Sequence, residues 1–175
     1  MERLFKQLEQ RENGKLYFKK GTHYNSQDFT HISKGELVIP FMGGYHELSF
    51  QSLQREGSTG YKHHLHSYVN RSRHTTLFIV APRKAITRMV KPKAPWRYRL
   101  LCPNEEVNAL LRENESINEL YLQAEAAKIA PWIQGRTESN YFVIKTQYIT
   151  EASSESFFTS AFETLKRLMR EFNQT

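Results

Sequence analysis

Five short segments between residues 35 and 102 constrain the fold of this chain more than any other feature of its sequence. Each is rich in aromatic or β-branched residues, and glycine, serine or proline clusters separate them. The segments are 35–41, 45–53, 61–69, 75–81 and 96–102. Short runs of this kind with turn residues between them are typical of antiparallel strands, so the sequence predicts an antiparallel meander.

Helical patterns flank this strand-rich region, which extends over residues 15–102. Residues 1–12 place apolar side chains at helical spacing, and residues 103–175 predict helix, strand and helix in that order. A chain of 175 residues has the length of one domain. We therefore expect a single α+β domain over residues 1–175, in which C-terminal helices cover a largely antiparallel β-sheet.

Three signals locate the elements of the C-terminal region. Residues 116–119, with the sequence SINE, match a capping box and predict two short helices or one broken helix there. Residues 140–150 carry apolar side chains on both faces, as expected for an interior strand. Either Ser153 or Ser154 is predicted to cap a final helix whose wide apolar stripe covers the sheet.

The cysteine content and the hydropathy pattern predict the cellular location. Cys102 is the only cysteine, which excludes an intramolecular disulfide and any metal centre built from several thiolates. The N-terminus is charged, and the longest apolar run, residues 77–81, is far shorter than the roughly 20 residues that span a bilayer. We expect a soluble, intracellular and cytoplasmic protein, although a soluble fragment of a longer membrane protein would have the same features.

The net charge of +7 is distributed unevenly along the chain. Residues 55–99 carry eleven Lys and Arg against one acid, a net charge of +10. Residues 100–125 carry six Glu against one Arg, a net charge of −5. Such asymmetry indicates an anionic partner or association driven by charge, and it does not indicate a particular fold.

The basic segment interleaves its cations with aromatic residues such as Tyr68, Trp96 and Tyr98. Lys and Arg contact phosphates while unpaired bases stack on aromatic rings, and an anionic membrane surface attracts the same cations. The residues predicted to bind a polyanion are Arg71, Arg73, Arg83, Lys84, Arg88, Lys91, Lys93, Arg97 and Arg99. In the alternative interpretation, strand alternation directs the aromatic rings into the core and the arginines to solvent, where they face the acidic helix.

Four histidines lie between residues 61 and 74, a stretch without a single acid. In a strand over residues 61–69, His64, His66 and Tyr68 would share one face, which we expect to meet solvent. The other side chains of this strand, beginning with His63, would help to line the core. The stretch is thus predicted to be one strand and turn of a cationic sheet surface.

Two kinds of chemistry are weak alternatives for these histidines. His64 and His66, with His46 or His74 from a neighbouring strand, are candidate metal ligands, but the surrounding cations and the lack of a nearby carboxylate disfavour this site. His64, His66 and His74 are also candidate acids and bases for metal-free phosphoester cleavage. The tripeptides that begin at His31 and His74 loosely resemble the paired His-x-Ser/Thr motifs of two-histidine phosphoesterases, although both depart from that motif at positions that should be apolar.

These patterns lead to three functional hypotheses. The leading one is a non-enzymatic domain whose basic segment 55–99 binds a polyanion, with RNA or DNA favoured over an anionic membrane surface, and without a cofactor. The second is an assembly module that joins a protein partner or a second copy of the chain through complementary charge. The acidic side of that contact would be Glu105, Glu106, Glu113, Glu115 and Glu119. The third is a histidine-based phosphoesterase or nuclease.

Overall fold

The computed structural model describes residues 1–25, 28–41, 43–55, 58–70, 72–83, 97–150 and 154–173. Eight strands lie within these ranges: β1 (Lys15–Asn25), β2 (Asp28–Phe41), β3 (Gly44–Arg55), β4 (Ser58–Val69), β5 (Phe78–Pro82), β6 (Tyr98–Leu101), β7 (Trp132–Glu138) and β8 (Tyr141–Thr150). The helices within them are α1 (Glu2–Glu12), α3 (Glu105–Glu113), α4 (Glu115–Ala126) and α5 (Glu155–Phe172).

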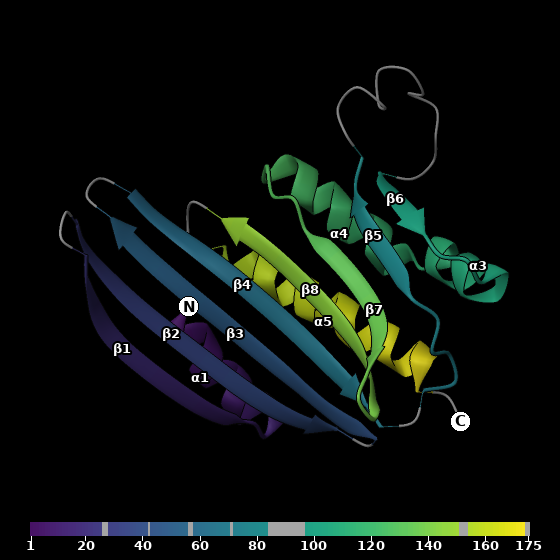
Figure 1. The fold of residues 1–175 in the computed structure, drawn as a ribbon, viewed down its shortest axis with the longest axis horizontal. Coiled ribbons are helices and arrows are strands. Elements are labelled where there is room, and N and C mark those ends of the chain that lie inside the picture. Colours follow the sequence, from purple (N-terminus) through teal and green to yellow (C-terminus); the bar gives the residue numbers. More distant parts are fainter. Residues whose placement is uncertain are drawn as a thin grey trace.

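All eight strands form one antiparallel sheet in the order β1-β2-β3-β4-β8-β7-β5-β6 (Figure 1). The first four strands follow each other as a meander. The sequence predicted β3, β4 and the second half of β2 within it, whereas β1 and the first half of β2 were not among the predicted strands. The meander does not continue into β5, because β8 pairs with β4 and lies with β7 between β4 and β5. The prediction of an interior strand over residues 140–150 is confirmed by the position of β8.

Helices α1, α4 and α5 lie on one face of this sheet (Figure 1). The apolar stripe of α5 is buried there, with Phe158, Phe162 and Phe172 fully buried. Phe5 of α1 packs edge-on against Phe50 of β3 at 4.9 Å between ring centroids, and at 5.3 Å from Phe158. Burial of these large aromatic side chains supplies much of the hydrophobic stabilisation of the layer between helices and sheet. The expected α+β class, with helices over an antiparallel sheet, is confirmed.

Two predictions for the C-terminal region are corrected by the structure. Residues 103–175 contain two strands, because β7 precedes β8 and pairs with it across a tight turn that includes Ser139 at a positive φ of 53°. The helix α4 is capped by Asn114 and not by Ser116: the Asn114 Oδ1 accepts a hydrogen bond from the backbone N–H of Ile117 at 3.3 Å. Ser154 is the N-cap residue of α5.

Within the part of the chain that the structure describes, no helix is long and apolar enough to cross a membrane.

Candidate functional site

The sheet face opposite α1, α4 and α5 is not covered by any described helix, and we call it the open face. Strand β4 shows how the two faces differ: its residues His63, Leu65, Ser67 and Val69 are fully buried on the helix side. The residues between them, among them His64, His66 and Tyr68, are only partly buried on the open face. This division is the one that strand alternation predicted for residues 61–69.

The strand register brings polar and aromatic residues together across the open face. Glu47 of β3 is opposite His66 of β4, which is opposite Lys145 of β8. At the next position on this face, two residues along each strand, Tyr45 is opposite Tyr68. In the other direction, the residues that lie side by side are Ser49 of β3, His64 of β4, Gln147 of β8 and Trp132 of β7. The centre of the open face is therefore polar, with aromatic rings on two sides.

Three tyrosines form an aromatic cluster at one end of the open face. The rings of Tyr45 and Tyr68 stack at 4.4 Å between centroids with an interplanar angle of 15°. Tyr141 meets both rings edge-on, at 6.0 Å and 5.9 Å. Burial, followed by the nearby Glu47 carboxylate, raises the pKa of Tyr68. Tyr68 therefore remains a neutral hydrogen-bond donor at physiological pH.

The two histidines at the centre of the open face favour their neutral forms. Desolvation, followed by the neighbouring Lys145 ammonium, lowers the pKa of His66 to about 4. Desolvation and then the cations Lys62 and Lys34 also lower the pKa of His64. The Nε2 atom of His66 is buried without a hydrogen-bond partner in the described structure, and its Nδ1 lies 3.5 Å from the Tyr68 hydroxyl. Because the Nε2 atom of His66 is buried, the partly exposed His64 is the histidine of this pair that can bond to a polar group of a ligand.

Cationic side chains on the open face outnumber acidic ones. Among its described residues the cations are Lys15, Lys34, Lys62, Arg99, Arg136 and Lys145, and the acids are Glu36, Glu47 and Glu138, which gives a net charge of +3. Some of this charge is paired within the face: the Lys145 Nζ lies 2.6 Å from Glu138, which Arg136 also contacts. Lys15 and Lys62 have no ion-pair partner among the described residues.

Two exposed aromatic side chains lie on the open face away from the tyrosine cluster. Tyr17 of β1 is 56% exposed, and Trp132 of β7 is 50% exposed. Ile149 of β8, on the same face, is 67% exposed. Large side chains this accessible on one face provide flat apolar surface on which a planar ligand can stack.

The basic residues predicted to bind a polyanion are only partly described. Arg71, Lys84, Arg88, Lys91 and Lys93 lie outside the described residues. Of the others, Arg73 is 3.5 Å from Glu106 of α3, and Arg97 is 2.7 Å from Glu125 of α4. Arg83 directly follows β5, and Arg99 is exposed on β6.

The C-terminal part of the basic segment fits the alternative interpretation, in which strand alternation directs aromatic rings into the core and arginines to solvent. Tyr98 is only 4% exposed, and its hydroxyl donates to the backbone carbonyl of Leu111 at 3.1 Å. Arg97 and Arg99, on either side of it, are exposed. Arg97 pairs with the acidic helix layer. The tyrosine of this stretch thus belongs to the core, and it is not available for stacking.

The structure brings His64 and His66 together, with 6.0 Å between their ring centroids, but it separates His46 and His74 from them. His46 lies on the helix side of the sheet, where its Nδ1 is 2.6 Å from the Ser67 hydroxyl and its ring contacts Phe162 of α5. His64 and His66 lie on the open face, and His74 packs against the ring of Phe172 at 5.7 Å. No three His, Cys, Asp or Glu side chains are arranged to hold a metal ion in the described ranges.

Several residues of the open face were not among the sequence candidates. Tyr141, Trp132 and Lys145 join the face only because β8 and β7 pair beside β4, whereas Tyr45 reaches it through the pairing of β3 with β4. The alternation of Tyr141, Val143 and Lys145 within β8 was visible in the sequence. The sequence did not indicate that β8 pairs with β4. Comparisons with protein-family models, curated proteins and solved structures found no match.

Proposed function

We propose that the protein binds single-stranded nucleic acid on the open face of its sheet. The observation that carries the proposal is the combination, on one uncovered face, of accessible aromatic rings with a net charge of +3 among the described residues. A cytoplasmic role fits the single cysteine of the chain.

Single-stranded nucleic acid fits this surface better than a duplex does. Unpaired bases stack on aromatic side chains irrespective of sequence, whereas a duplex hides the faces of its bases. Trp132 and Tyr17 are half exposed and lie on different strands, which provides separate stacking positions across the sheet. Around them, Ser49, His64 and Gln147 can donate or accept hydrogen bonds at base edges.

The charge on the open face supports contact with phosphates. Lys62 and Lys15 have no ion-pair partner in the described structure, so a phosphate does not have to displace a carboxylate from them. The segment that joins β5 to β6 adds Lys84, Arg88, Lys91 and Lys93 in its sequence. A basic surface of this kind attracts a polyanion through its field and holds it by releasing counterions.

Fluorescence anisotropy with labelled single-stranded RNA, single-stranded DNA and duplex DNA tests the proposal. We expect tighter binding to a single strand than to the duplex. Trp132→Ala should weaken it by at least about fivefold, because one base stacked on an aromatic ring contributes about 1–3 kcal/mol. Lys62→Ala should reduce the slope of log K against log salt by about 0.7, the contribution of one phosphate contact in a single strand.

Two variants on the helix side are matched controls. Leu122 of α4 is 49% exposed, close to the exposure of Trp132, and Arg167 of α5 is an exposed cation like Lys62. Leu122→Ala and Arg167→Ala should bind as the wild type does. Equal affinity of Trp132→Ala and wild type, or no binding even at low salt, would contradict the proposal. Salt-sensitive self-association of the protein without nucleic acid would then favour the assembly hypothesis.

A further inference from the structure

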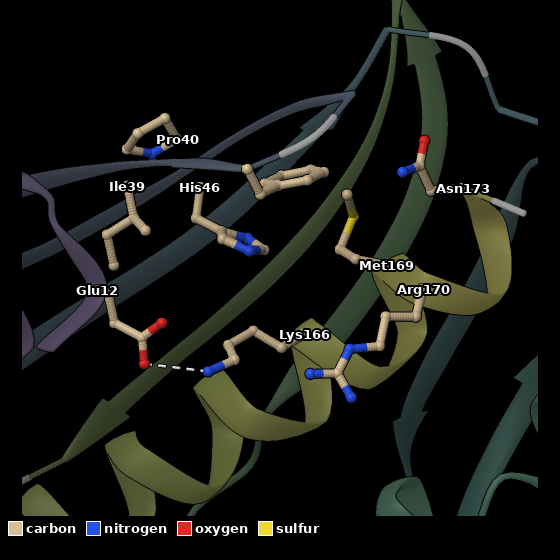
Figure 2. Close-up of a pocket in the computed structure, with 9 residues that line it drawn as sticks. Glu12, Ile39, Pro40, His46, Lys166, Met169, Arg170 and Asn173 are labelled. Atoms are coloured by element: carbon tan, nitrogen blue, oxygen red, sulfur yellow. Dashed lines mark hydrogen bonds and ion pairs between the residues drawn. The ribbon is translucent and has the colours of Figure 1, made fainter.

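A cavity of about 230 Å³ lies on the helix side of the sheet, away from the open face. It is bordered by the end of α1, the end of β2, the start of β3, and the last two turns of α5 (Figure 2). Its volume is below the range typical of pockets for drug-sized molecules, so it fits only a small ligand. The lining residues are Glu12, Ile39, Pro40, Phe41, His46, Lys166, Met169, Arg170 and Asn173.

One part of the cavity wall is apolar. Ile39, Pro40 and Phe41 belong to the end of β2, and Met169 comes from α5. The Phe41 ring lies 4.6 Å from the His46 ring, which fixes both rings against each other. An apolar wall of this kind favours a ligand with an apolar body.

The other part of the wall carries two cations from successive turns of α5. Figure 2 shows Lys166 and Arg170 on the helix, with Lys166 directed toward Glu12. The Lys166 Nζ is 3.0 Å from Glu12 and 3.3 Å from Glu163, so its charge is partly compensated. Arg170 is exposed, and no described residue forms an ion pair with it. Arg170 is therefore the cation in this cavity that a ligand can pair with directly.

His46 adds a polar group that is already oriented. It is 5% exposed, and its Nδ1 lies 2.6 Å from the hydroxyl of Ser67, which is itself fully buried. When Ser67 donates its proton to Nδ1, the imidazole carries its own proton on Nε2 and can donate it. Because Ser67 is completely buried, its hydroxyl can orient the imidazole but is not accessible to a substrate as a nucleophile.

We propose that this cavity binds a small organic monocarboxylate with an apolar body, its carboxylate beside Arg170, Lys166 and His46. The apolar wall formed by Ile39, Phe41 and Met169 would hold the body of the ligand. This binding site is separate from the open face and does not depend on the function proposed above.

The local charge selects a monoanion over a dianion such as phosphate. Lys166, Arg170 and the nearby Arg11 supply three positive charges, and Glu12 and Glu163, which both pair with Lys166 and Arg11, remove two of them. The C-terminal end of α5, which borders the cavity, adds a partial negative charge of about half a unit from the helix dipole. Phosphate would exceed the remaining positive charge, and it has no apolar part to contact Ile39 or Met169.

Titration of the ¹⁵N-labelled protein with benzoate, followed by ¹H–¹⁵N correlation spectra, tests the inference. We expect saturable shifts confined to backbone amides near residues 12, 39–46 and 166–173. Benzamide has the same shape without the charge and should bind about tenfold more weakly. Inorganic phosphate should also bind more weakly than benzoate.

Two variants identify the side chains responsible. Arg170→Gln should weaken benzoate binding by about threefold to tenfold, and because Arg170 is exposed the variant should fold normally. Arg167→Gln, on the same helix but outside the cavity, should bind benzoate as the wild type does. The double variant Glu12→Gln/Lys166→Met removes the ion pair without leaving an unpaired charge and should also weaken binding. Shifts that do not saturate, shifts elsewhere, or equal binding of benzamide would overturn the inference.

Discussion

At the scale of single residues, two glycines illustrate how closely the sheet is packed. A Cβ atom at Gly135 in β7 would overlap the ring of Phe78, and Phe78 is fully buried in β5. A Cβ atom at Gly60 in β4 would meet no atom within 4 Å. The two positions therefore separate the effect of lost space from the general effect of replacing a glycine.

Gly135→Ala should lower the free energy of unfolding by about 1–3 kcal/mol, because the new methyl group displaces the Phe78 ring from its packed position. Gly60→Ala should leave the free energy of unfolding unchanged or raise it slightly, because alanine reduces the freedom of the unfolded chain. Urea denaturation followed by circular dichroism measures both variants. Equal stability of Gly135→Ala and wild type would show that the Phe78 ring moves aside without cost.

The sequence predicted the side-chain directions within single strands more reliably than the contacts between strands. His63 and His64 lie on opposite faces because alternation is a property of one strand and needs no knowledge of its partners. The contact of His46 with Ser67 depends instead on the register of β3 against β4. No pattern near His46 indicated that register, so its separation from His64 and His66 was not predictable.

At the scale of elements, the helix caps can be compared directly. The Asn104 Oδ1 accepts a hydrogen bond from the Val107 N–H at 2.9 Å at the start of α3. Ser154 occupies the N-cap position of α5, but its side chain makes no capping hydrogen bond. The Asn104 side chain thus satisfies a backbone N–H group at the start of α3, whereas the Ser154 side chain does not do so at the start of α5.

Asn104→Ala should lower the free energy of unfolding by about 1 kcal/mol through loss of this cap. Ser154→Ala should have a much smaller effect, because no capping bond is lost. Thermal and urea denaturation of the two variants provide the comparison. If Ser154→Ala were the more destabilising change, the two caps would have to be reassigned.

Strand β7 shows why some elements could not be predicted. Its sequence follows Pro131 and contains Gly135, and both residues usually signal turns. The pairing of β7 with β8 and β5 outweighs these signals. A glycine fits at position 135 because the Phe78 ring occupies the space that a Cβ atom would need. The final helix α5 was predictable because its apolar stripe is long and periodic.

At the scale of the whole molecule, the order of the strands is the feature that the sequence could not provide. The pairing of β4 with β8 joins residues such as Tyr61 and Thr150, which are far apart in the chain. Pairing at such separation depends on global packing and leaves no local signal. Tyr141 completes the tyrosine cluster, and Lys145 joins the open face, only because of this pairing, so the candidate site was only partly predictable.

The charge asymmetry of the chain is partly resolved inside the molecule. Arg73 and Arg97 of the basic segment pair with Glu106 and Glu125 of the acidic helices. Glu106 was one of the acids expected to meet a protein partner. These pairs are exposed, so each contributes little to stability. They nevertheless direct two of the predicted polyanion-binding arginines toward the helices, and the open face is left as the basic surface with accessible aromatic rings.

The stability of the whole molecule should decrease as the pH falls from about 6.5 toward 4. Desolvation lowers the pKa of His46 and of His63 from 6.5 to about 4. Above pH 6.5 both imidazoles are neutral in the folded and the unfolded protein, so they cause no pH dependence. Between these values the unfolded chain binds protons that the folded protein does not, which favours unfolding by up to about 3 kcal/mol per histidine.

Urea denaturation at pH 7.5, 6.0 and 4.8 measures this loss. The range lies above the ordinary carboxyl pKa of 4.5, so paired acids such as Glu138, whose pKa is lowered by Lys145, contribute little to it. The imidazole signals of His46 and His63 in NMR spectra should remain those of the neutral form down to pH 5. His63→Gln should reduce the pH dependence only in part, because His46 and the open-face histidines His64 and His66, whose pKa values are also lowered, remain. An imidazole of His46 or His63 that titrates near pH 6.5 in the folded protein would show that its burial does not exclude the charged form.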